Sequence, residues 1–402
     1  MTYWCVALGV NSHSVWAYHF FFSFSTSQLW SFCPNGSPVF TSPKKMGNNQ
    51  TWITEVILLG FQVDPELEVL LFGFFLLFYS VTLLGNGVIL GLICLDSRLH
   101  TPMYFFLSNL AIVDMSYASS TVPKMLANLV THKKAIAFGP CILQTFLYLA
   151  FAVTECTCLV VMSYDRYVAI CHPLQYTVIM SWSVCTVLAA TSWVFSFLWA
   201  LVHTTLILRL PFCGPQKINY FFCQIMSVFK LACADTQLNE LVLFVGSVFV
   251  LVGPLCLVLV SYMRILFAVL KIQSGEGRRK AFSTCSSHLC VVGLFFGCAI
   301  VMYVAPKSHH FQEQRKILSL FYSFFNPMLN PLIYSLRNAE VKGALLRFLG
   351  KRRSLGGMVG SILSVWAVPH HTLKPGAWMP FWVLCFNQPR TLCLWTCCKM
   401  RK

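Results

Sequence analysis

The sequence predicts an all-α membrane protein, a bundle of seven transmembrane helices followed by a short amphipathic helix. Three observations carry this prediction. Of the 402 residues, 57% are hydrophobic and only 10% are charged, whereas about 25% are charged in an average soluble domain. The apolar residues are gathered in long runs rather than spread over amphipathic faces. Each run is close to the roughly 20 residues that a helix needs to cross a bilayer core. Seven such runs occur: 69–95, 103–122, 141–162, 183–208, 241–263, 281–304 and 317–336.

Little charge interrupts these runs. The second contains Asp114 and the third contains Glu155, and the other five have no Asp, Glu, Lys or Arg. Turn-forming residues separate the runs, including 96–100, Gly139-Pro140 and 274–277. After the seventh run, residues 338–349 place apolar side chains at helical spacing beside Lys342 and Arg347, which favours a helix lying along the membrane surface. A plain linker is the alternative for that stretch.

The two ends of the chain differ from its middle. Residues 1–45 hold no acidic residue and show no clear period, and residues 351–402 mix basic, aromatic and cysteine residues without pattern. We therefore predict a disordered amino-terminal extension at 1–45, a seven-transmembrane domain at 46–350 and a disordered tail at 351–402. The tail's longest apolar pieces are too short to span a membrane.

The formal net charge of +16 does not favour nucleic acid as a partner, because the basic residues lie in short loops and at the ends of the runs. Basic residues in these places are typical of membrane proteins, where they flank the membrane-spanning helices. Basic residues at 264–280 and 337–353 suggest a cytosolic side, but the opposite loops are also basic. Charge alone leaves the orientation open.

Sequence motifs of catalysis are missing. The chain has no GxSxG, no HExxH and no glycine-rich phosphate loop, and it has no two matched CxxC pairs for zinc. We expect no enzyme, no catalytic residue and no metal centre of that kind.

The third run carries a polar feature. If Arg166 faces the bundle interior, helical spacing places Glu155 and, further along, Ala152 and Tyr148 on the same face. Glu155 then lies about 16 Å from Arg166, near the middle of the membrane, where an ionisable group costs roughly 2.5 to 3.5 kcal/mol. Asp114 is its natural companion. The two acids either form a sodium or proton site or belong to a hydrogen-bonded polar core.

Four cysteines are expected on one side of the membrane. Cys141 begins the third run, and the loop 209–240 carries Cys213, Cys223 and Cys233. In an oxidising compartment these can form disulfides, and three pairings are possible. Asn49-Gln50-Thr51 is an N-glycosylation sequon a short way before the first run.

Four ordered motifs carry a resemblance to a known family: LHTPMYFFLSNLAIVD at 99–114, MSYDRYVAIC at 162–171, KAFSTCSSHLCVV at 280–292 and NPMLNPLIYSLRN at 326–338, together with Gly85-Asn86. This set resembles the signature of vertebrate odorant (olfactory) receptors, which are rhodopsin-like G-protein-coupled receptors. The similarity is greatest to class II, family 2, subfamily A.

The resemblance implies a plasma-membrane protein with its amino end outside and its carboxyl end in the cytosol. It implies the disulfides Cys141–Cys223 and Cys213–Cys233. It also implies that small volatile odorants bind in the outer half of the bundle and activate a heterotrimeric stimulatory, olfactory-type G protein, which raises cAMP. By motif position, the ligand-binding residues are Tyr148, Ala152, Val153, Ser247, Val250, Ile300, Tyr303 and Ser323.

The resemblance further implies how the signal is passed. Arg166 is held by Asp165 at rest and contacts the G protein when the helices open. The remaining residues assigned to coupling and activation are Tyr167, Tyr262, Asn330, Pro331 and Tyr334. The chain departs from the family pattern at Ser163, where Ala is usual, and at Phe296, where Tyr is usual. Family members usually begin shortly before the sequon, so we expect Met46 to be the natural start.

Two alternatives remain at the level of sequence. A seven-helix transporter or proton pump would use Asp114 and Glu155 as its relay. A receptor with these extensions would be retained in the cell and inactive.

Overall fold

The computed structural model describes residues 53–131, 134–213, 216–271, 275–304, 311–336 and 339–354. The chain divides into two units, Met1–Leu346 and Arg347–Lys402, and the packing described below is that of the first. The predicted extension 1–45, the sequon at Asn49 and all of the tail beyond Ser354 lie outside the described residues. The predicted domain boundaries therefore stay predictions.

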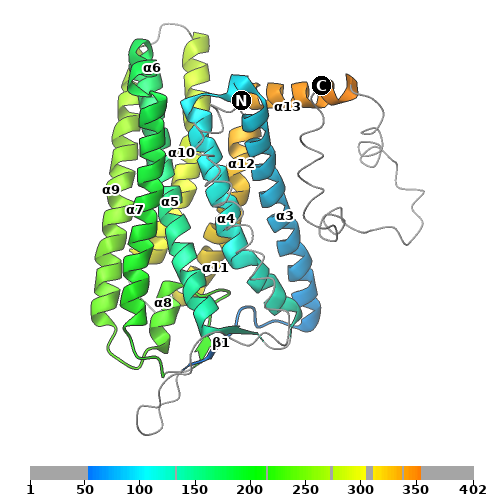
Figure 1. The fold of residues 1–402 in the computed structure, drawn as a ribbon, viewed down its shortest axis with the longest axis vertical. Coiled ribbons are helices and arrows are strands. Elements are labelled where there is room, and N and C mark those ends of the chain that lie inside the picture. The colour runs from blue at the N-terminus through cyan, green and yellow to red at the C-terminus, as the bar shows by residue number, and fades with distance from the viewer. Residues whose placement is uncertain are drawn as a thin grey trace, which may run out of the picture. The chain divides into compact units, whose positions relative to one another are not determined.

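Seven helical segments run side by side in this unit (Figure 1). They confirm the predicted seven-helix bundle, and each covers one of the seven apolar runs. The first six are single helices and the seventh is built from three pieces. In chain order they are α3 (Pro65–Leu95), α4 (Pro102–Val130), α5 (Phe138–Cys171), α7 (Trp182–Leu208), α9 (Gln237–Leu270), α10 (Gly275–Tyr303), and α11 (Phe311–Leu320) continued by η5 (Phe321–Phe325) and α12 (Asn326–Leu336).

Five of the described helices, namely α3, α5, α7, α9 and α10, are long and apolar enough to cross a membrane by length and composition alone. The other two segments differ for physical reasons. Helix α4 is long enough but is more polar, since it contains Asp114 and Lys124. The seventh segment is divided by η5, a five-residue π-helix. The most apolar part of α3 is only 11% buried, so its side chains face outward, as a lipid-facing helix requires.

Proline marks helix starts and interior bends. Pro65 and Pro102 stand in the first turns of α3 and α4, where the missing backbone N–H has no intrahelical partner to lose. Pro254 lies inside α9 and Pro331 inside α12. There the missing donor removes a hydrogen bond from the helix and permits a bend.

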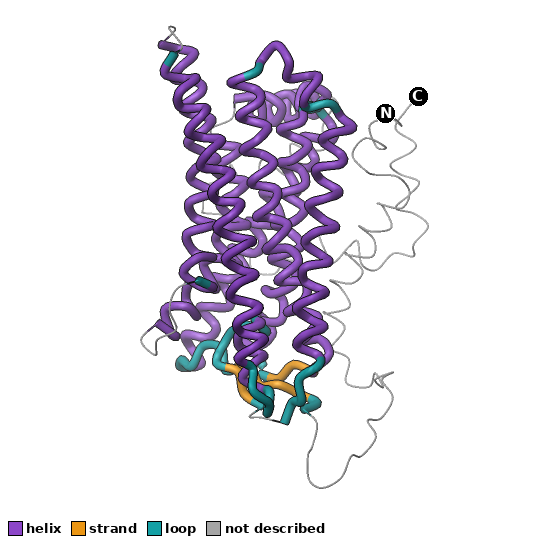
Figure 2. Tube along the Cα trace, turned by 90° about the vertical axis from the view of Figure 1, so that its left-hand side faces the viewer, coloured by secondary structure: helices purple, strands orange, loops and turns teal. Residues whose placement is uncertain are grey.

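A small three-stranded sheet closes one end of the bundle (Figure 2). Its strands are β1 (Glu55–Leu58), β2 (Ala135–Ala137) and β3 (Lys217–Ile218), in the order β2-β1-β3. Strand β1 pairs antiparallel with β2 and parallel with β3. The sheet thus joins the segment before α3 to the loops before α5 and after α7. We call this the sheet end of the bundle.

The opposite end carries α6 (Tyr176–Ile179) in the loop between α5 and α7 (Figure 1), and we call it the α6 end. Helix α13 (Ala339–Ser354) follows the seventh segment, where the sequence predicts an amphipathic helix. Its Glu340 accepts a hydrogen bond of 2.7 Å from Tyr104 of α4. The remaining short helices are η2 (Ser97–Leu99), η3 (Pro173–Gln175), α8 (Ile225–Val228) and η4 (Phe229–Leu231).

Candidate functional site

The loop after α7 is fastened over the sheet end of α5 by three contacts at one residue. Cys223 forms a disulfide with Cys141. Its backbone N–H donates to Gln144 Oε1 (2.9 Å), and its carbonyl accepts from Thr145 Oγ1 (3.2 Å). A second disulfide, Cys213–Cys233, closes the same loop on itself. These are the two pairings that the resemblance implies, and they hold the loop as a lid over the bundle.

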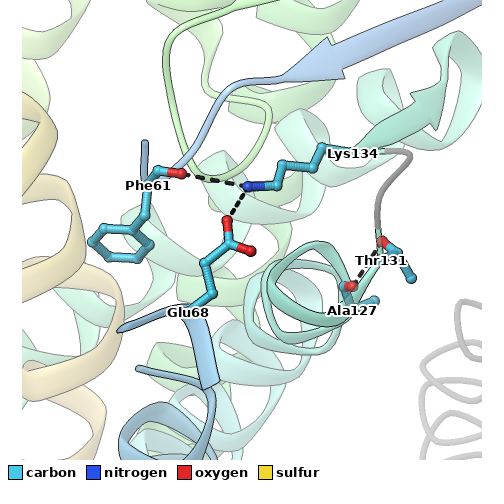
Figure 3. A network of polar contacts seen from close by, with 5 residues as sticks. All are labelled: Phe61, Glu68, Ala127, Thr131 and Lys134. Carbon is cyan, nitrogen blue, oxygen red and sulfur yellow. Dashed lines mark hydrogen bonds and ion pairs between the residues drawn. The ribbon is translucent and has the colours of Figure 1, made fainter. Parts of the chain in front are cut away.

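A separate cleft of about 830 Å³ opens beside the sheet, lined by β1, the start of α3 and nearby loop residues. Lys134 Nζ contacts the Glu68 carboxylate and the carbonyl oxygen of Phe61 across this cleft (Figure 3). Close by, Thr131 caps the end of α4 by donating to the carbonyl of Ala127 (2.9 Å). No predicted ligand-binding residue lines this cleft, so it lies apart from the site expected inside the bundle.

Beneath the lid, aromatic side chains with hydroxyl groups gather between α4, α5 and η5. The rings of Tyr117 and Tyr148 are 5.1 Å apart, and Tyr148 stacks on Phe222 of the lid at 5.2 Å. Tyr322 contacts Tyr117 edge-on at 5.8 Å. Tyr148 also lies next to Tyr303 of α10 and Ser323 of η5. We call Tyr117, Tyr148, Phe222, Tyr322 and Ser323 the tyrosine cluster.

The structure unites part of the predicted ligand-binding set. Tyr148, Tyr303 and Ser323 come together at the tyrosine cluster, and Tyr303 accepts a hydrogen bond from Gln224 of the lid at 3.5 Å. The others lie on α5, α9 and α10 without a described polar contact to the cluster. Of these, Ala152, Val153 and Val250 are buried, whereas Ser247 and Ile300 are half-buried.

The predicted inward face of α5 is confirmed. Tyr148, Ala152, Glu155, Leu159 and Met162 are all buried, each less than 9% exposed. Arg166, at the α6 end of the same face, is half-buried. Burial alone does not single out this face, because every residue of α5 from 148 to 156 is buried. The ring contact of Tyr148 with Tyr117 and the hydrogen bond of Glu155 with Asn326 show that the face looks into the bundle.

Midway along the bundle, one asparagine connects the two buried acids. Asn330 Nδ2 of α12 lies 3.0 Å from both carboxylate oxygens of Asp114 and 3.3 Å from Glu155 Oε1. Asn326 Nδ2 donates to the same Glu155 oxygen at 2.7 Å. The four residues, called the polar core here, join α4, α5 and the seventh segment.

The polar core also offers oxygen atoms to a cation. Glu155 Oε2, Asn326 Oδ1 and Asn330 Oδ1 are buried and have no hydrogen-bond partner among the described residues. Hard cations such as sodium are bound by carboxylate and carbonyl oxygens of this kind. The donor set fits sodium. Within the described ranges, no group of three or more His, Cys, Asp or Glu is placed to hold a metal ion.

At the α6 end, Asp165 has a partner that the sequence did not predict. The Asp165 carboxylate accepts a 2.7 Å hydrogen bond from the Tyr176 hydroxyl of α6. Asp165 and Arg166, both within the described part of the chain, form no ion pair in this conformation. Adjacent residues on a helix point in directions about 100° apart, so Asp165 turns toward α6 while Arg166 turns toward the bundle. Tyr176 is thus its hydrogen-bond partner, and the expected restraint of Arg166 by Asp165 stays a prediction. Tyr167 contacts His172 at 3.1 Å.

Two predicted activation residues meet at a histidine. The ring of His288 from α10 stacks on Tyr262 of α9 at 5.6 Å and lies 6.5 Å from Tyr334 of α12. All three side chains are buried. Within the described ranges, the hydroxyls of Tyr262 and Tyr334 have no hydrogen-bond partner. Pro331, three residues before Tyr334, packs near Gly85 of α3, where an added methyl group would come within 3.1 Å of its ring.

The two departures from the family pattern have different surroundings. Ser163 donates to the carbonyl of Val160 in its own helix (2.7 Å), so its hydroxyl makes no new contact between helices. Phe296 is buried and packs edge-on against Phe295 at 5.1 Å. Of the two departures, the one at Phe296, where the usual hydroxyl is missing, therefore changes the bundle interior more than the one at Ser163.

Several residues at these sites escaped the sequence reasoning: Tyr117, Phe222, Gln224, Tyr322 and Tyr176. One signal was present for Tyr117, which follows Asp114 by three residues and so shares its helical face. The direction of the Tyr322 side chain depends on η5. A turn of a π-helix holds about one residue more than a turn of an α-helix, so its side chains point in other directions than α-helical spacing predicts. The positions of Phe222, Gln224 and Tyr176 depend on loops, which carry no period.

Comparisons with known proteins agree with this architecture. Residues 75–352 match the family model described as olfactory receptor. The chain is 83% identical to olfactory receptor 2A12 and 74% identical to olfactory receptor 2A5, both from Homo sapiens, over 310 residues in each case. It is 64% identical to olfactory receptor 2A7 from Mus musculus over 310 residues. Each alignment covers 77% of this chain and 100% of the relative.

A crystal structure of squid rhodopsin resembles the fold with a TM-score of 0.56, over 76% of this chain and 94% of that one. The two sequences are 18% identical. At this identity the likeness concerns the fold alone, and it supports the seven-helix arrangement.

Proposed function

This chain belongs to the olfactory receptor family, and we propose that it binds small volatile odorants at the tyrosine cluster and activates a stimulatory, olfactory-type G protein. The family consists of signalling receptors in the membrane, so the chain is a multi-pass membrane receptor and no enzyme. The transporter alternative loses its support with this membership. The ligand position, the type of G protein and the rise in cAMP are the proposed parts.

The observation that carries the proposal is the lid over the tyrosine cluster. Tyr148 stacks on Phe222, and Phe222 is the neighbour of Cys223, which is fastened to α5 by a disulfide and two hydrogen bonds. A ligand that enters here contacts α4, α5, α10 and η5 together. Apolar and aromatic walls with a few hydroxyl groups suit small organic molecules.

The same helices lead from this site to the α6 end. Helix α5 carries Tyr148, then Glu155 and then Arg166, and α12 carries Asn330 and then Tyr334. A ligand that binds the open arrangement of these helices more tightly than the resting one shifts the population toward it. The opened α6 end then admits the G-protein α subunit, with Arg166, Tyr167, Tyr262 and Tyr334 at the contact. Nucleotide exchange takes place in that partner.

Disulfides support the orientation. Both bridges lie at the sheet end, and disulfides persist on the extracellular side of the plasma membrane rather than in the cytosol. We therefore place the sheet end and the amino end outside the cell, and the α6 end and the carboxyl end in the cytosol.

We assign a sodium ion to the polar core as a regulator. Asp114, Glu155, Asn326 and Asn330 would hold it, and the ion would supply positive charge between two acids that otherwise repel each other. Because Asn330 and Asp114 belong to different helical segments, a movement of one segment against the other would change the binding of the ion.

The test is a screen of odorants on cells that display the full, surface-tagged chain and carry a cAMP reporter, with ion flux recorded in parallel. Asp114→Asn and Glu155→Gln are run beside the parent chain. A concentration-dependent cAMP response supports the receptor. Ion flux without any G-protein response would contradict it.

A further inference from the structure

A hydrogen bond between Tyr104 and Glu340 joins α4 to α13. The Tyr104 hydroxyl donates to Glu340 Oε2 at 2.7 Å. Tyr104 stands near the start of α4 and is only 1% exposed, so packing fixes the direction of its hydroxyl. Glu340 stands in the first turn of α13. Because a carboxylate is a charged acceptor, this bond is stronger than one between two neutral groups. We call the pair the clasp.

Apolar contacts hold the first turns of α13 against the same part of the bundle. Val341 and Ala344 are buried and belong to the main apolar core. They are three residues apart and therefore share one face of the helix. Since α12 ends at Leu336 and α13 begins at Ala339, the two helix ends are at most about 11 Å apart along the backbone. A displacement of α13 from α4 is therefore passed to the end of α12.

Helix α12 is fastened a second time, one to two turns before its end. Asn330 lies 3.0 Å from both carboxylate oxygens of Asp114 on α4. Asn86 of α3 donates to the carbonyl of Pro327 at 3.0 Å. Tyr334 comes one turn after Asn330 and before the clasp. The turn of α12 that carries Tyr334 is thus held on both sides, by α3 and α4 on one and by the clasp on the other.

The described conformation is closed at this end of α12. Tyr262, His288 and Tyr334 meet there and are 8%, 1% and 7% exposed. The proposed function places Tyr262 and Tyr334 at the contact with the G protein, and buried side chains cannot make that contact. The described conformation is therefore the resting one, and the clasp is present in it.

We propose that the clasp of Tyr104 and Glu340 positions the end of α12 in the resting arrangement and breaks when the α6 end opens. The inference rests on the proposed function, because it assigns two further residues to the control of G-protein coupling. A hydrogen bond made in one arrangement alone favours the population of that arrangement. Loss of this bond should raise the ratio of open to resting chains about 2- to 10-fold, the value of one hydrogen bond.

Amide hydrogen exchange of the full chain in lipid nanodiscs tests the clasp without any G protein. Tyr104→Phe removes the hydroxyl and keeps the ring. We expect amides in the last turns of α12, and in the half of α10 nearest the α6 end, to exchange about 2- to 10-fold faster than in the parent chain. If the bond only holds α13 in place, exchange should rise in α13 alone.

Matched variants at the acid separate the hydrogen bond from other effects of the substitution. Glu340→Ala should act like Tyr104→Phe, whereas Glu340→Gln keeps an oxygen acceptor and should stay close to the parent chain. The double variant of Tyr104→Phe and Glu340→Ala should exchange no faster than either single variant, because both remove the same bond.

Two controls remove equivalent groups elsewhere. Tyr79→Phe deletes a hydroxyl that bonds Ser119 at 2.9 Å and so joins α3 to α4, without the seventh segment. Glu66→Ala deletes a carboxylate from the first turn of α3, as Glu340→Ala does from α13, and so matches its cost to the helix dipole. Both controls should leave exchange in α12 and α10 at the level of the parent chain.

The second readout is cAMP in cells that carry the stimulatory olfactory-type α subunit, compared at equal surface levels. Tyr104→Phe and Glu340→Ala should raise cAMP without odorant about 2- to 10-fold. They should also move the odorant response to lower concentration, because more of the chain is already open. A variant that is only less stable would lower both signals.

The outcomes separate the inference from the proposed function. Faster exchange in α12 and α10, in a chain whose parent gives no cAMP response to odorants, supports the inference and overturns the proposed function. A parent chain that signals, with a Tyr104→Phe variant that changes exchange in α13 alone and leaves cAMP the same, does the opposite. The inference is also overturned if Glu340→Gln behaves like Glu340→Ala, or if the effects of Tyr104→Phe and Glu340→Ala add.

Discussion

The side-chain amide of Asn330 lies 3.0 Å from each carboxylate oxygen of Asp114, so the seventh segment is joined directly to α4 in the middle of the bundle. The same nitrogen is 3.3 Å from Glu155 of α5. A contact shared by three helices responds to any movement of one against the others. The polar core lies between the tyrosine cluster and the α6 end. A helix movement that starts at either place therefore changes its hydrogen bonds.

Sodium should stabilise the parent chain and not its Asp114→Asn variant. The amide keeps the shape of the side chain but removes one of the two charges that attract a cation. A bound ligand stabilises the folded state by mass action, by about 2.7 kcal/mol at 100 times its Kd. The check is thermal unfolding in nanodiscs, in sodium against a large organic cation at equal ionic strength.

The control for that experiment is Asp235→Asn, at an exposed acid near the start of α9. Its response to sodium should equal that of the parent chain. A sodium effect of full size in Asp114→Asn would remove the ion from the polar core.

Replacing Tyr176 by Phe should lower the free energy of unfolding by about 1.5 to 3 kcal/mol, the range for a hydrogen bond to a charged group. The variant leaves the Asp165 carboxylate without its donor. It should also change basal signalling, because Asp165 is released beside Arg166. Tyr164→Phe, at an exposed position on the same stretch of α5, should do neither.

The contribution of Tyr176 should not vary between pH 7 and 9. Burial, and then the nearby Asp165 charge, raise the pKa of the Tyr176 hydroxyl above its ordinary value. A group whose folded pKa is raised contributes its full stability below the unfolded value of about 10 and loses it as pH rises through the folded value. A stability difference between parent and Tyr176→Phe that disappears by pH 8 would contradict this account.

Gly246→Ala should push α7 and α9 apart. An added methyl group at Gly246 would lie 2.7 and 2.9 Å from ring atoms of Trp199, and overpacking of this kind costs about 1 to 3 kcal/mol. Gly87→Ala, where an added methyl meets nothing within 4 Å, is the neutral comparison. Adding Trp199→Phe to Gly246→Ala should restore much of the lost stability in a double-mutant cycle. Strict additivity would show that the two residues do not meet.

Removing the Cys141–Cys223 bridge should destabilise the chain more than removing Cys213–Cys233. The bridges close loops with sequence separations of 82 and 20 residues, and loop entropy makes the difference about 1 kcal/mol. Only loss of the first should weaken odorant binding, since it fastens the lid beside Phe222. Paired Cys→Ser variants, measured by thermal unfolding and ligand binding, check both statements. Equal loss of binding in the two would contradict the role of the lid.

Much of the bundle could be predicted because a membrane makes periodicity and length informative. The seven runs mark the seven segments, and helical spacing places Tyr148 and Glu155 on one face of α5, where both contact other helices of the bundle. The helices are longer than the runs, since polar ends continue into the lipid head groups. Helix α10, for example, begins at Gly275, inside a stretch that reads as a turn.

The remaining features depend on contacts between distant segments. Strands of two to four residues, such as Lys217–Ile218, have no alternating pattern to detect. The partner of Asp165 sits in a loop helix eleven residues away, and the facing of Tyr322 depends on a π-turn that no local motif announces. The polar core could be predicted in part. The sequence indicates that Asp114 and Glu155 belong together, but only the fold shows that Asn330 lies between them.

The most direct test of the receptor assignment is the cAMP response of cells that display the full chain, measured across a panel of odorants with and without the stimulatory olfactory-type α subunit. We predict a saturable, concentration-dependent rise in cAMP that needs this subunit and is shifted to higher odorant concentration by Tyr148→Phe. A chain that reaches the surface and carries an odorant-driven ion current, with no cAMP response in the presence of the subunit, would contradict the account.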